Sequence, residues 1–278
     1  MRILVLGDLH GKKPRLRVKD FNAVIAPGDF CSDKLVSIMF KTLNMRLKNP
    51  FIAIEWYDIL GRKKSKELAK KSISSGRTIL EFLNSLEVPV FIVPGNWDWF
   101  PEKYSEWNFL RKDHYKNMKR DLKNIKDAHK KILKIGDYQI IGYGLSSGPE
   151  YPQDENEYFE EELAEFRKFY RNESRKMSSL FIKAKKPTIF LSHNVPFNTT
   201  LDKIRNKKSP RYGMHYGSVV ARDMIIKHKP LLFISGHMHE NMGKCRVGRT
   251  LCINTGSGPK VNTLVEMKGR KVKVRFYR

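Results

Sequence analysis

Short runs of apolar residues, most of them followed by a glycine or a polar residue, recur along the chain. They are too short for helices and are rich in branched side chains, which is typical of strands buried on both faces of a sheet. The runs occupy residues 3–6, 21–27, 90–93, 188–192, 230–235 and 251–254. We therefore expect a layered α/β core in which helices cover the sheets.

Further strands are expected at a hairpin and near the end of the sequence. Residues 132–135 and 138–141 flank Gly136-Asp137, a two-residue turn signal with the glycine first. Residues 262–267 and 271–277 also have strand character. In the second of these, apolar residues alternate with lysine and arginine, so one face is apolar and the other is basic.

Apolar residues at helical spacing predict helices between the strands. The predicted helices are 33–47, 66–86, 107–125, a long amphipathic helix within 149–186, and 218–228. Residues 33–86 and 149–186 are expected to be helical insertions in one domain that spans residues 1–278. Trp56 and Tyr57 suggest a loop or short helix over a cleft, and residues 199–217 suggest a mobile loop.

The charge of the chain is strongly positive. It has 54 lysines and arginines against 29 acidic residues, a formal net charge of +25, and an isoelectric point near 9.9. This balance favours polyanionic partners such as nucleic acid, or anionic substrates. A lysine-rich surface without a nucleic-acid partner explains it equally well, because the excess is spread along the whole chain.

Cysteine content and hydropathy bear on the cellular compartment. Cys31, Cys245 and Cys252 have no CxxC spacing, and their odd number argues against a disulfide framework. No apolar run approaches the ~20 residues of a membrane span, and no signal-peptide pattern opens the sequence. We expect a cytoplasmic protein that does not enter the membrane.

Polar side chains that can bind metal ions follow the predicted strands. The carboxylates, amide and imidazoles at these strand ends are Asp8, His10, Asp29, Asn96, His193, His237 and His239. The carboxyl ends of strands are where open α/β sheets place their ligands. A mixed oxygen and nitrogen set suits borderline divalent ions such as Mn, Fe, Co, Ni or Zn better than Ca. Seven ligands are too many for one catalytic ion and about right for two ions that share a bridging ligand.

The motifs that contain these residues resemble the calcineurin-like metallophosphoesterase superfamily. They are Asp8-x-His10, Gly28-Asp29, Gly95-Asn96-Trp97-Asp98, Ser192-His193 and Gly236-His237-Met238-His239, in the family's order and across nearly the whole chain. The last motif, with residues 253–257, resembles the branch of bacterial cyclic-nucleotide phosphodiesterases and uncharacterised archaeal phosphoesterases. The resemblance implies a four-layer α/β/β/α sandwich of two mixed sheets with the dimetal site at one edge.

The resemblance also implies a role for each residue. Asp8, His10 and His239 would bind one metal ion, and Asn96, His193 and His237 the other. Asp29 would bridge the two ions, and Asp98 would orient a neighbour by a hydrogen bond. A hydroxide held between two divalent ions, manganese first among the candidates, would attack the phosphorus of a phosphoester.

One position departs from the family pattern. The family has Gly-Asn-His-Asp, where the histidine is the usual proton donor to the leaving group, and this chain has Trp97 in its place. His215, in the loop before Gly217-Ser218, is a candidate substitute donor or phosphate contact; its alternative is an exposed loop histidine.

Three functions are consistent with these residues. The first is a dimetal phosphoesterase, with phosphodiesters including nucleotides favoured over phosphomonoesters. The second is a metal-stabilised binding protein or scaffold with little catalysis. The third is a nucleic-acid processing enzyme whose basic surface binds the substrate.

Overall fold

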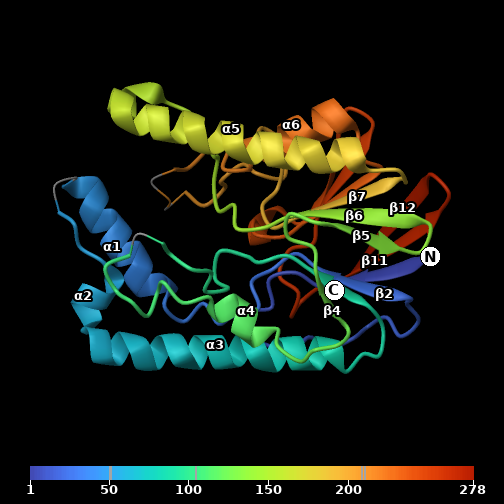
Figure 1. Ribbon diagram of the computed structural model, residues 1–278, viewed down its shortest axis with the longest axis horizontal. Coiled ribbons are helices and arrows are strands. Elements are labelled where there is room, and N and C mark those ends of the chain that lie inside the picture. The colour runs from blue at the N-terminus through green and yellow to red at the C-terminus, as the bar shows by residue number, and fades with distance from the viewer. Residues whose placement is uncertain (50–51, 104, 208, 210) are drawn as a thin grey trace.

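The computed structural model describes residues 1–49, 52–103, 105–207, 209 and 211–278, and its strands form two six-stranded mixed sheets (Figure 1). The first sheet has the order β12-β11-β1-β2-β3-β4, with β1 Arg2–Val5, β2 Ala23–Ala26, β3 Val90–Ile92, β4 Ile125–Asp127, β11 Asn262–Lys268 and β12 Lys271–Tyr277. The second has the order β5-β6-β7-β8-β10-β9, with β5 Ile132–Ile135, β6 Tyr138–Tyr143, β7 Thr188–Ser192, β8 Leu232–Ser235, β9 Gly243–Val247 and β10 Thr250–Asn254.

Helices cover the outer face of each sheet. The helices are α1 Val36–Lys48, α2 Trp56–Leu60, α3 Arg62–Asn84, α4 His114–Met118, α5 Glu160–Lys183 and α6 Val219–His228, with 3-10 turns η1 Glu155–Glu157 and η2 His239–Asn241. Side chains of α3 and α4 pack on the first sheet, and those of α5 and α6 pack on the second. Figure 1 shows α3 and α5 on opposite sides of the paired sheets. The predicted four-layer α/β/β/α sandwich is confirmed.

The apolar run of residues 3–6, at the end of β1 and directly after it, shows why every position of such a run is apolar. Ile3 and Val5 face the core between the two sheets, whereas Leu4 and Leu6 face the helical layer outside. All four side chains are fully buried. Because successive side chains of a strand point to opposite faces, a strand between two buried layers needs an apolar residue at every position. The same condition holds for the other short apolar runs at the centre of the sheets.

The hairpin and the basic strand were predicted correctly. β5 and β6 pair in antiparallel register around Gly136, which has a φ of +56°. In β12, Val272 and Val274 pack against the core, whereas the alternating Lys271, Lys273 and Arg275 are exposed. Ser218 caps α6, as its position before the predicted helix indicated, by accepting a hydrogen bond from the Ala221 N–H at 3.0 Å.

The predicted helix over 107–125 was wrong. Only His114–Met118 is helical, and Asp121 adopts a left-handed φ of 63° shortly after it. The apolar residues of this segment do not form one stripe, because Trp107 and Phe109 pack into an aromatic cluster while Tyr115 and Met118 pack under the first sheet. Residues from Ile125 onward form β4, which sequence periodicity did not predict.

The helices predicted over 33–47 and 66–86 and within 149–186 form as α1, α3 and α5. Trp56 and Tyr57 lie on the short helix α2, where both pack in the aromatic cluster, and Trp56 also lines a cavity. Residues 50 and 51 of the first insertion, and 208 and 210 of the loop over 199–217, lie outside the described residues. Among the helices described, none has the length and apolar composition to cross a membrane.

Candidate metal centre

The strand-end side chains singled out in the sequence come from both sheets and meet at one edge. Parallel pairing of β1 with β2, of β2 with β3, and of β7 with β8 places their carboxyl ends together. Asp8 and His10 follow β1, Asp29 follows β2, and Asn96 follows β3. The second sheet contributes His193 after β7, and His237 and His239 after β8.

The backbone turns sharply at several of these residues. Asp8, His10, Asp29 and His237 have φ values of 51°, 46°, 59° and 67°, in the left-handed region that costs free energy for residues other than glycine. Hydrogen bonds between neighbouring loops hold these turns; the His10 N–H, for example, donates to the Asp29 carbonyl at 2.9 Å. The surrounding structure therefore fixes the direction of each side chain before any ligand binds.

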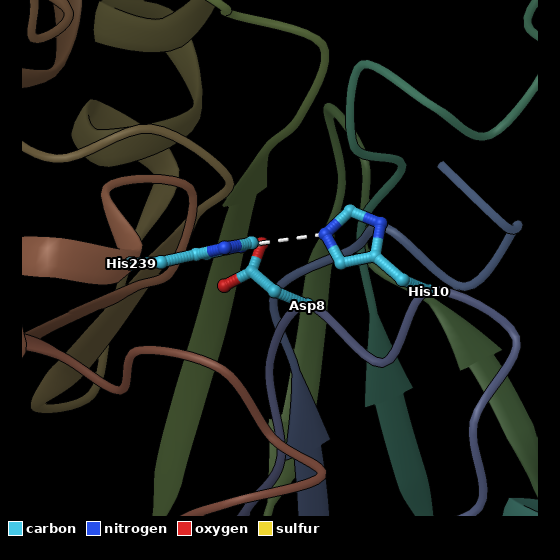
Figure 2. A group of neighbouring side chains, drawn as sticks. All are labelled: Asp8, His10 and His239. Carbon is cyan, nitrogen blue, oxygen red and sulfur yellow. Dashed lines mark hydrogen bonds and ion pairs between the residues drawn. The ribbon is translucent and has the colours of Figure 1, made fainter. Parts of the chain in front are cut away.

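Asp8, His10 and His239 form the first ligand group, shown in Figure 2. Their possible ligand atoms lie within 4.8 Å of one another. His10 Nε2 is 3.3 Å from His239 Nε2, which in turn lies 3.7 Å from Asp8 Oδ1. His10 Nδ1 is buried and has no hydrogen-bond partner among the described residues. The His237 backbone N–H donates to both carboxylate oxygens of Asp8, at 2.9 and 3.0 Å.

Asp29, His193 and His237 form the second ligand group, and Asn96 adjoins it. His193 Nδ1 lies 2.8 Å from the Pro27 carbonyl, which can only accept, so Nδ1 bears the proton. His193 Nε2 then carries a lone pair toward Asn96 Oδ1 at 2.8 Å and Asp29 Oδ2 at 3.6 Å. A hydrogen bond that orients an imidazole through its other nitrogen is typical of metal-binding histidines.

Asp29 lies between the two groups. Its Oδ2 is 3.7 Å from His10 Nε2 of the first group and 3.6 Å from His193 Nε2 of the second. Its Oδ1 accepts a hydrogen bond from the Trp97 backbone N–H at 2.9 Å. One oxygen is thus held by the backbone, and the other faces an imidazole of each group.

Asp98 is fully buried beneath Asp29 and contacts backbone instead of ligand side chains. Its carboxylate accepts hydrogen bonds of 2.7 to 3.2 Å from the N–H groups of Asp29, Phe30, Cys31 and Gly95. Burial raises the pKa of Asp98, although these N–H donors act in the opposite direction. The side chain joins the loops after β2 and β3, and so positions the backbone of Asp29.

Burial favours the forms of the imidazoles that bind metals. It lowers the pKa of His193 and brings the pKa of His237 to about 3, so both rings are neutral near pH 7. Burial alone would raise the pKa of Asp8, but its bond with His239 and the charges of the nearby imidazoles lower it. Burial raises the pKa of Asp29 well above its ordinary value; the charge of His10 opposes this rise, and the charges of Asp8 and Asp98 add to it.

Two glycines leave space for the carboxylates. A Cβ atom at Gly95 would overlap the carboxylate of Asp29, and one at Gly236 would overlap that of Asp8. Glycine is therefore required on both loops by the close approach of backbone to side chain. This requirement explains why glycine precedes Asn96 and His237 in the motifs.

The donor set and its unsatisfied atoms fit divalent metal ions. The two groups supply imidazole nitrogens and carboxylate oxygens, with an amide oxygen beside the second. His10 Nε2 faces Asp29 Oδ2 at 3.7 Å, and His193 Nε2, Asn96 Oδ1 and Asp29 Oδ2 face one another, so their lone pairs point together and no protein donor in the described part of the chain lies between them. A pair of borderline cations satisfies such an arrangement.

The structure places His215 with a partner outside these two groups. Its Nδ1 lies 2.7 Å from Oδ1 of Asp202, a fully buried carboxylate that also accepts hydrogen bonds from the N–H groups of Asn198, Thr199 and Gly217. Sequence reasoning did not find Asp202. The hydrogen bonds from both ends of the loop show that Asp202 holds it in shape, which the loop's basic composition did not indicate.

Apart from Trp56, which was expected over a cleft, other residues beside the ligand groups were also missed. The Ser147 backbone, on the loop after β6, hydrogen-bonds the ring of His237. Trp56, Trp99 and Leu145 line a cavity that begins at Asn96. The recurrence of tryptophan at 97 and 99, directly within the motif, was the available sequence signal for this cavity.

Comparison with known proteins agrees with the architecture. The model of a protein family described as calcineurin-like phosphoesterase matches residues 1–241. One solved structure aligns with a TM-score of 0.63 at 17% identity, over 99% of this chain and 98% of its own. The crystal structure of the protein TT1561 of Thermus thermophilus aligns with a TM-score of 0.52 at 16% identity, over 99% and 97% of the two chains. A search of curated proteins finds no match.

Proposed function

Because the chain belongs to the calcineurin-like phosphoesterase family, we propose that it hydrolyses phosphoesters with two divalent metal ions at the edge of its paired sheets. Phosphodiesters, including those of nucleotides or nucleic acid, are the proposed substrates in preference to phosphomonoesters. Manganese is the first candidate metal, and Fe, Ni, Co and Zn are alternatives that the same donor set accepts.

The proposed ligands follow the two groups. Asp8, His10 and His239 hold one ion, and Asn96, His193 and His237 hold the other. Asp29 contributes to both through Oδ2. When bound, such a pair of ions polarises phosphoryl oxygens and supplies a nucleophile from water near neutral pH.

The chain's own residues fix the geometry of this site. The Trp97 N–H holds Oδ1 of Asp29, so that Oδ2 stays between the groups. Asp98 fixes the backbone on which Asp29 stands. The Pro27 carbonyl fixes the tautomer of His193. In-line attack on a phosphoester requires fixed geometry of this kind, since misplaced groups lose much of the rate advantage of proximity.

The position of Asp29 is the observation that carries the proposal. A single carboxylate oxygen within 3.7 Å of an imidazole from each group gives two neighbouring sites that share a ligand. A protein that binds one structural ion has no need of a second, adjacent set of acceptors. This arrangement favours the dimetal enzyme over the scaffold.

The first test compares Asp29→Ala with Asp8→Ala. We expect Asp29→Ala to abolish hydrolysis of bis-p-nitrophenyl phosphate in Mn²⁺ and to lower metal content more than Asp8→Ala does, because it removes a ligand of both ions. Metal content is measured by atomic emission after dialysis. Two ions per chain and near-normal turnover in Asp29→Ala would show that the dimetal assignment is wrong.

A further inference from the structure

A cavity of about 370 Å³ lies beside the candidate metal centre and has aromatic walls. Its lining includes Trp56, Trp97, Trp99, Phe100, Asn96 and Ser147. We call it the aromatic cavity. Its volume falls within the range of about 300–1,000 Å³ that is usual for small-ligand pockets. The side chains of Trp97, Trp99 and Phe100 are only half-buried, so ring surface remains accessible there.

The aromatic cavity and the metal centre share residues. Asn96, which lies 2.8 Å from His193 Nε2, lines the cavity. The next residue, Trp97, provides both the N–H that holds Asp29 and a side chain in the cavity wall. On the opposite side, Ser147 lines the cavity and hydrogen-bonds His237 through its backbone. A ligand with its phosphate at the metal centre can therefore extend directly into the cavity.

The walls are fixed by contacts behind them. The rings of Trp56 and Trp99 meet edge to face at 6.0 Å, and the Trp99 indole N–H donates to the Ser72 hydroxyl at 3.1 Å. Phe100 packs against the rings of Tyr115 and His129. Because these side chains are already ordered, a ligand does not lose affinity by ordering them.

We propose that the aromatic cavity binds a planar aromatic ring carried by the phosphoester substrate, with a nucleobase as the biological ring of this kind. Aromatic walls select flat π-systems over sugars and alkyl chains, since stacking acts through the ring faces. Asn96, Ser147 and Glu102 add polar groups to the lining, and the first two also contact residues of the metal centre. This inference rests on the proposed phosphoesterase function and specifies its substrate class.

The proposal also assigns a role to the side chain of Trp97. Where the family pattern has a histidine, this chain has a larger ring that lines the cavity while keeping the backbone N–H on Asp29. The substitution therefore preserves the metal-side contact and adds ring surface on the other side. Trp97 becomes a residue that determines substrate preference.

Binding is tested first, without turnover. Three probes are titrated into the metal-loaded protein, with tryptophan fluorescence and calorimetry as readouts: adenosine 5′-monophosphate, phenyl phosphate and ribose 5-phosphate. We expect adenosine 5′-monophosphate to bind at least 10-fold more tightly than ribose 5-phosphate and to quench tryptophan fluorescence. Phenyl phosphate distinguishes a general aryl site, at which it binds as tightly as the nucleotide, from a site that needs the larger nucleobase.

Variants at position 97 test the wall itself. Trp97→Leu should reduce the preference for adenosine 5′-monophosphate over ribose 5-phosphate by about 10-fold, whereas Trp97→Phe, which retains a ring, should keep most of it. Phe40→Leu is the control, because Phe40 is an exposed aromatic residue on α1 outside the cavity lining. Circular dichroism of each variant establishes that it is folded.

The outcomes separate this inference from the proposed function. Equal binding of the nucleotide and ribose 5-phosphate, or an unchanged preference in Trp97→Leu, would overturn the aromatic site even if bis-p-nitrophenyl phosphate is hydrolysed. Ring-dependent binding in a protein that hydrolyses no phosphoester in any metal would support the aromatic site and overturn the phosphoesterase proposal instead.

Discussion

Asp98 makes the backbone of the candidate metal centre depend on one buried carboxylate. It accepts hydrogen bonds from the N–H groups of four residues on two loops, and one of these residues is Asp29. Hydrogen bonds to a charged acceptor contribute more than neutral ones, and a buried donor without a partner costs about 1–3 kcal/mol. The charge of Asp98 therefore stabilises both the fold and the backbone conformation of Asp29.

We expect Asp98→Asn to weaken metal binding by about 10- to 100-fold, in the range found when residues that orient metal ligands are changed. The amide replaces one acceptor oxygen with a donor that faces N–H groups. Calorimetric titration with Mn²⁺ measures the affinity, and urea unfolding measures the accompanying loss of stability. Asp137→Asn, at the exposed hairpin turn, is the matched control. Unchanged metal affinity in Asp98→Asn would remove it as a positioning residue.

Trp97 predicts a preference among leaving groups. An indole cannot donate an acidic proton, and general acid catalysis contributes about 10²–10⁴ in rate, chiefly for poor leaving groups. We expect Trp97→His to raise turnover of alkyl phosphodiesters about 10-fold or more, and turnover of p-nitrophenyl esters much less. Equal changes for both esters, measured as kcat in Mn²⁺, would contradict this expectation.

His215 offers a test of a second proton donor. Its Nδ1 is held by Asp202, which leaves Nε2 to exchange a proton. If the wild-type protein hydrolyses alkyl and aryl esters equally well, His215→Ala should slow the alkyl ester selectively. Losses of equal size on both substrates, or on neither, would exclude His215 as the donor.

Among the elements, the crossover from the first sheet to the second depends on His129. This residue follows β4, and its Nδ1 accepts a hydrogen bond from the Gly144 N–H, after β6, at 3.0 Å. Burial, with the nearby charge of Lys130, lowers the pKa of His129 from 6.5 to about 4. The neutral ring is therefore part of the connection between the sheets.

The pH dependence of stability follows from this pKa. The unfolded chain takes up a proton on His129 below about pH 6.5, whereas the folded protein resists it down to about pH 4. The contribution of His129 to stability should therefore fall by about 3 kcal/mol as the pH drops through this window, and this residue contributes no further loss below it. His129→Asn retains an acceptor without a titrating ring, so its urea unfolding should lose less stability between pH 7.5 and pH 4.5 than the wild type does. His114→Asn on α4 is the control, and equal losses in all three proteins would contradict the assignment.

Elements whose side chains all pack in one kind of environment were predictable from the sequence. Segments whose side chains enter two separate clusters were not. β1 lies wholly between two apolar layers, so an uninterrupted apolar run identified it. Residues 107–125 supply side chains to two separate clusters, so their spacing imitated a helix that does not form. The gathering of the candidate ligand residues could be predicted because each follows a strand directly. Two other contacts could not be predicted, because they depend on loop conformations that no local pattern encodes. They are the bond between Asp202 and His215 and the packing of Trp56 against Trp99.

For the whole molecule, the net charge of +25 predicts salt-dependent binding of polyanions. Each phosphate that a lysine or arginine neutralises releases counterion, so affinity should fall steeply as salt rises. We expect RNA to inhibit hydrolysis of bis-p-nitrophenyl phosphate at low ionic strength and to lose this effect near 0.5 M salt, roughly as counterion release requires. Binding without competition would show that the basic surface is separate from the candidate metal centre.

The placement of the basic residues has a second consequence, for self-association. The edge strands of the described sheets are β12, β4, β5 and β9. Each bears exposed basic side chains: Lys271, Lys273 and Arg275 on β12, Lys126 on β4, Lys134 on β5, and Lys244 and Arg246 on β9. An unpaired strand edge is a template for pairing with another molecule, and lysine at the edge is a common means of preventing it. When two copies approach edge to edge, like charges meet, so we expect pairing between the sheets of two molecules to be disfavoured.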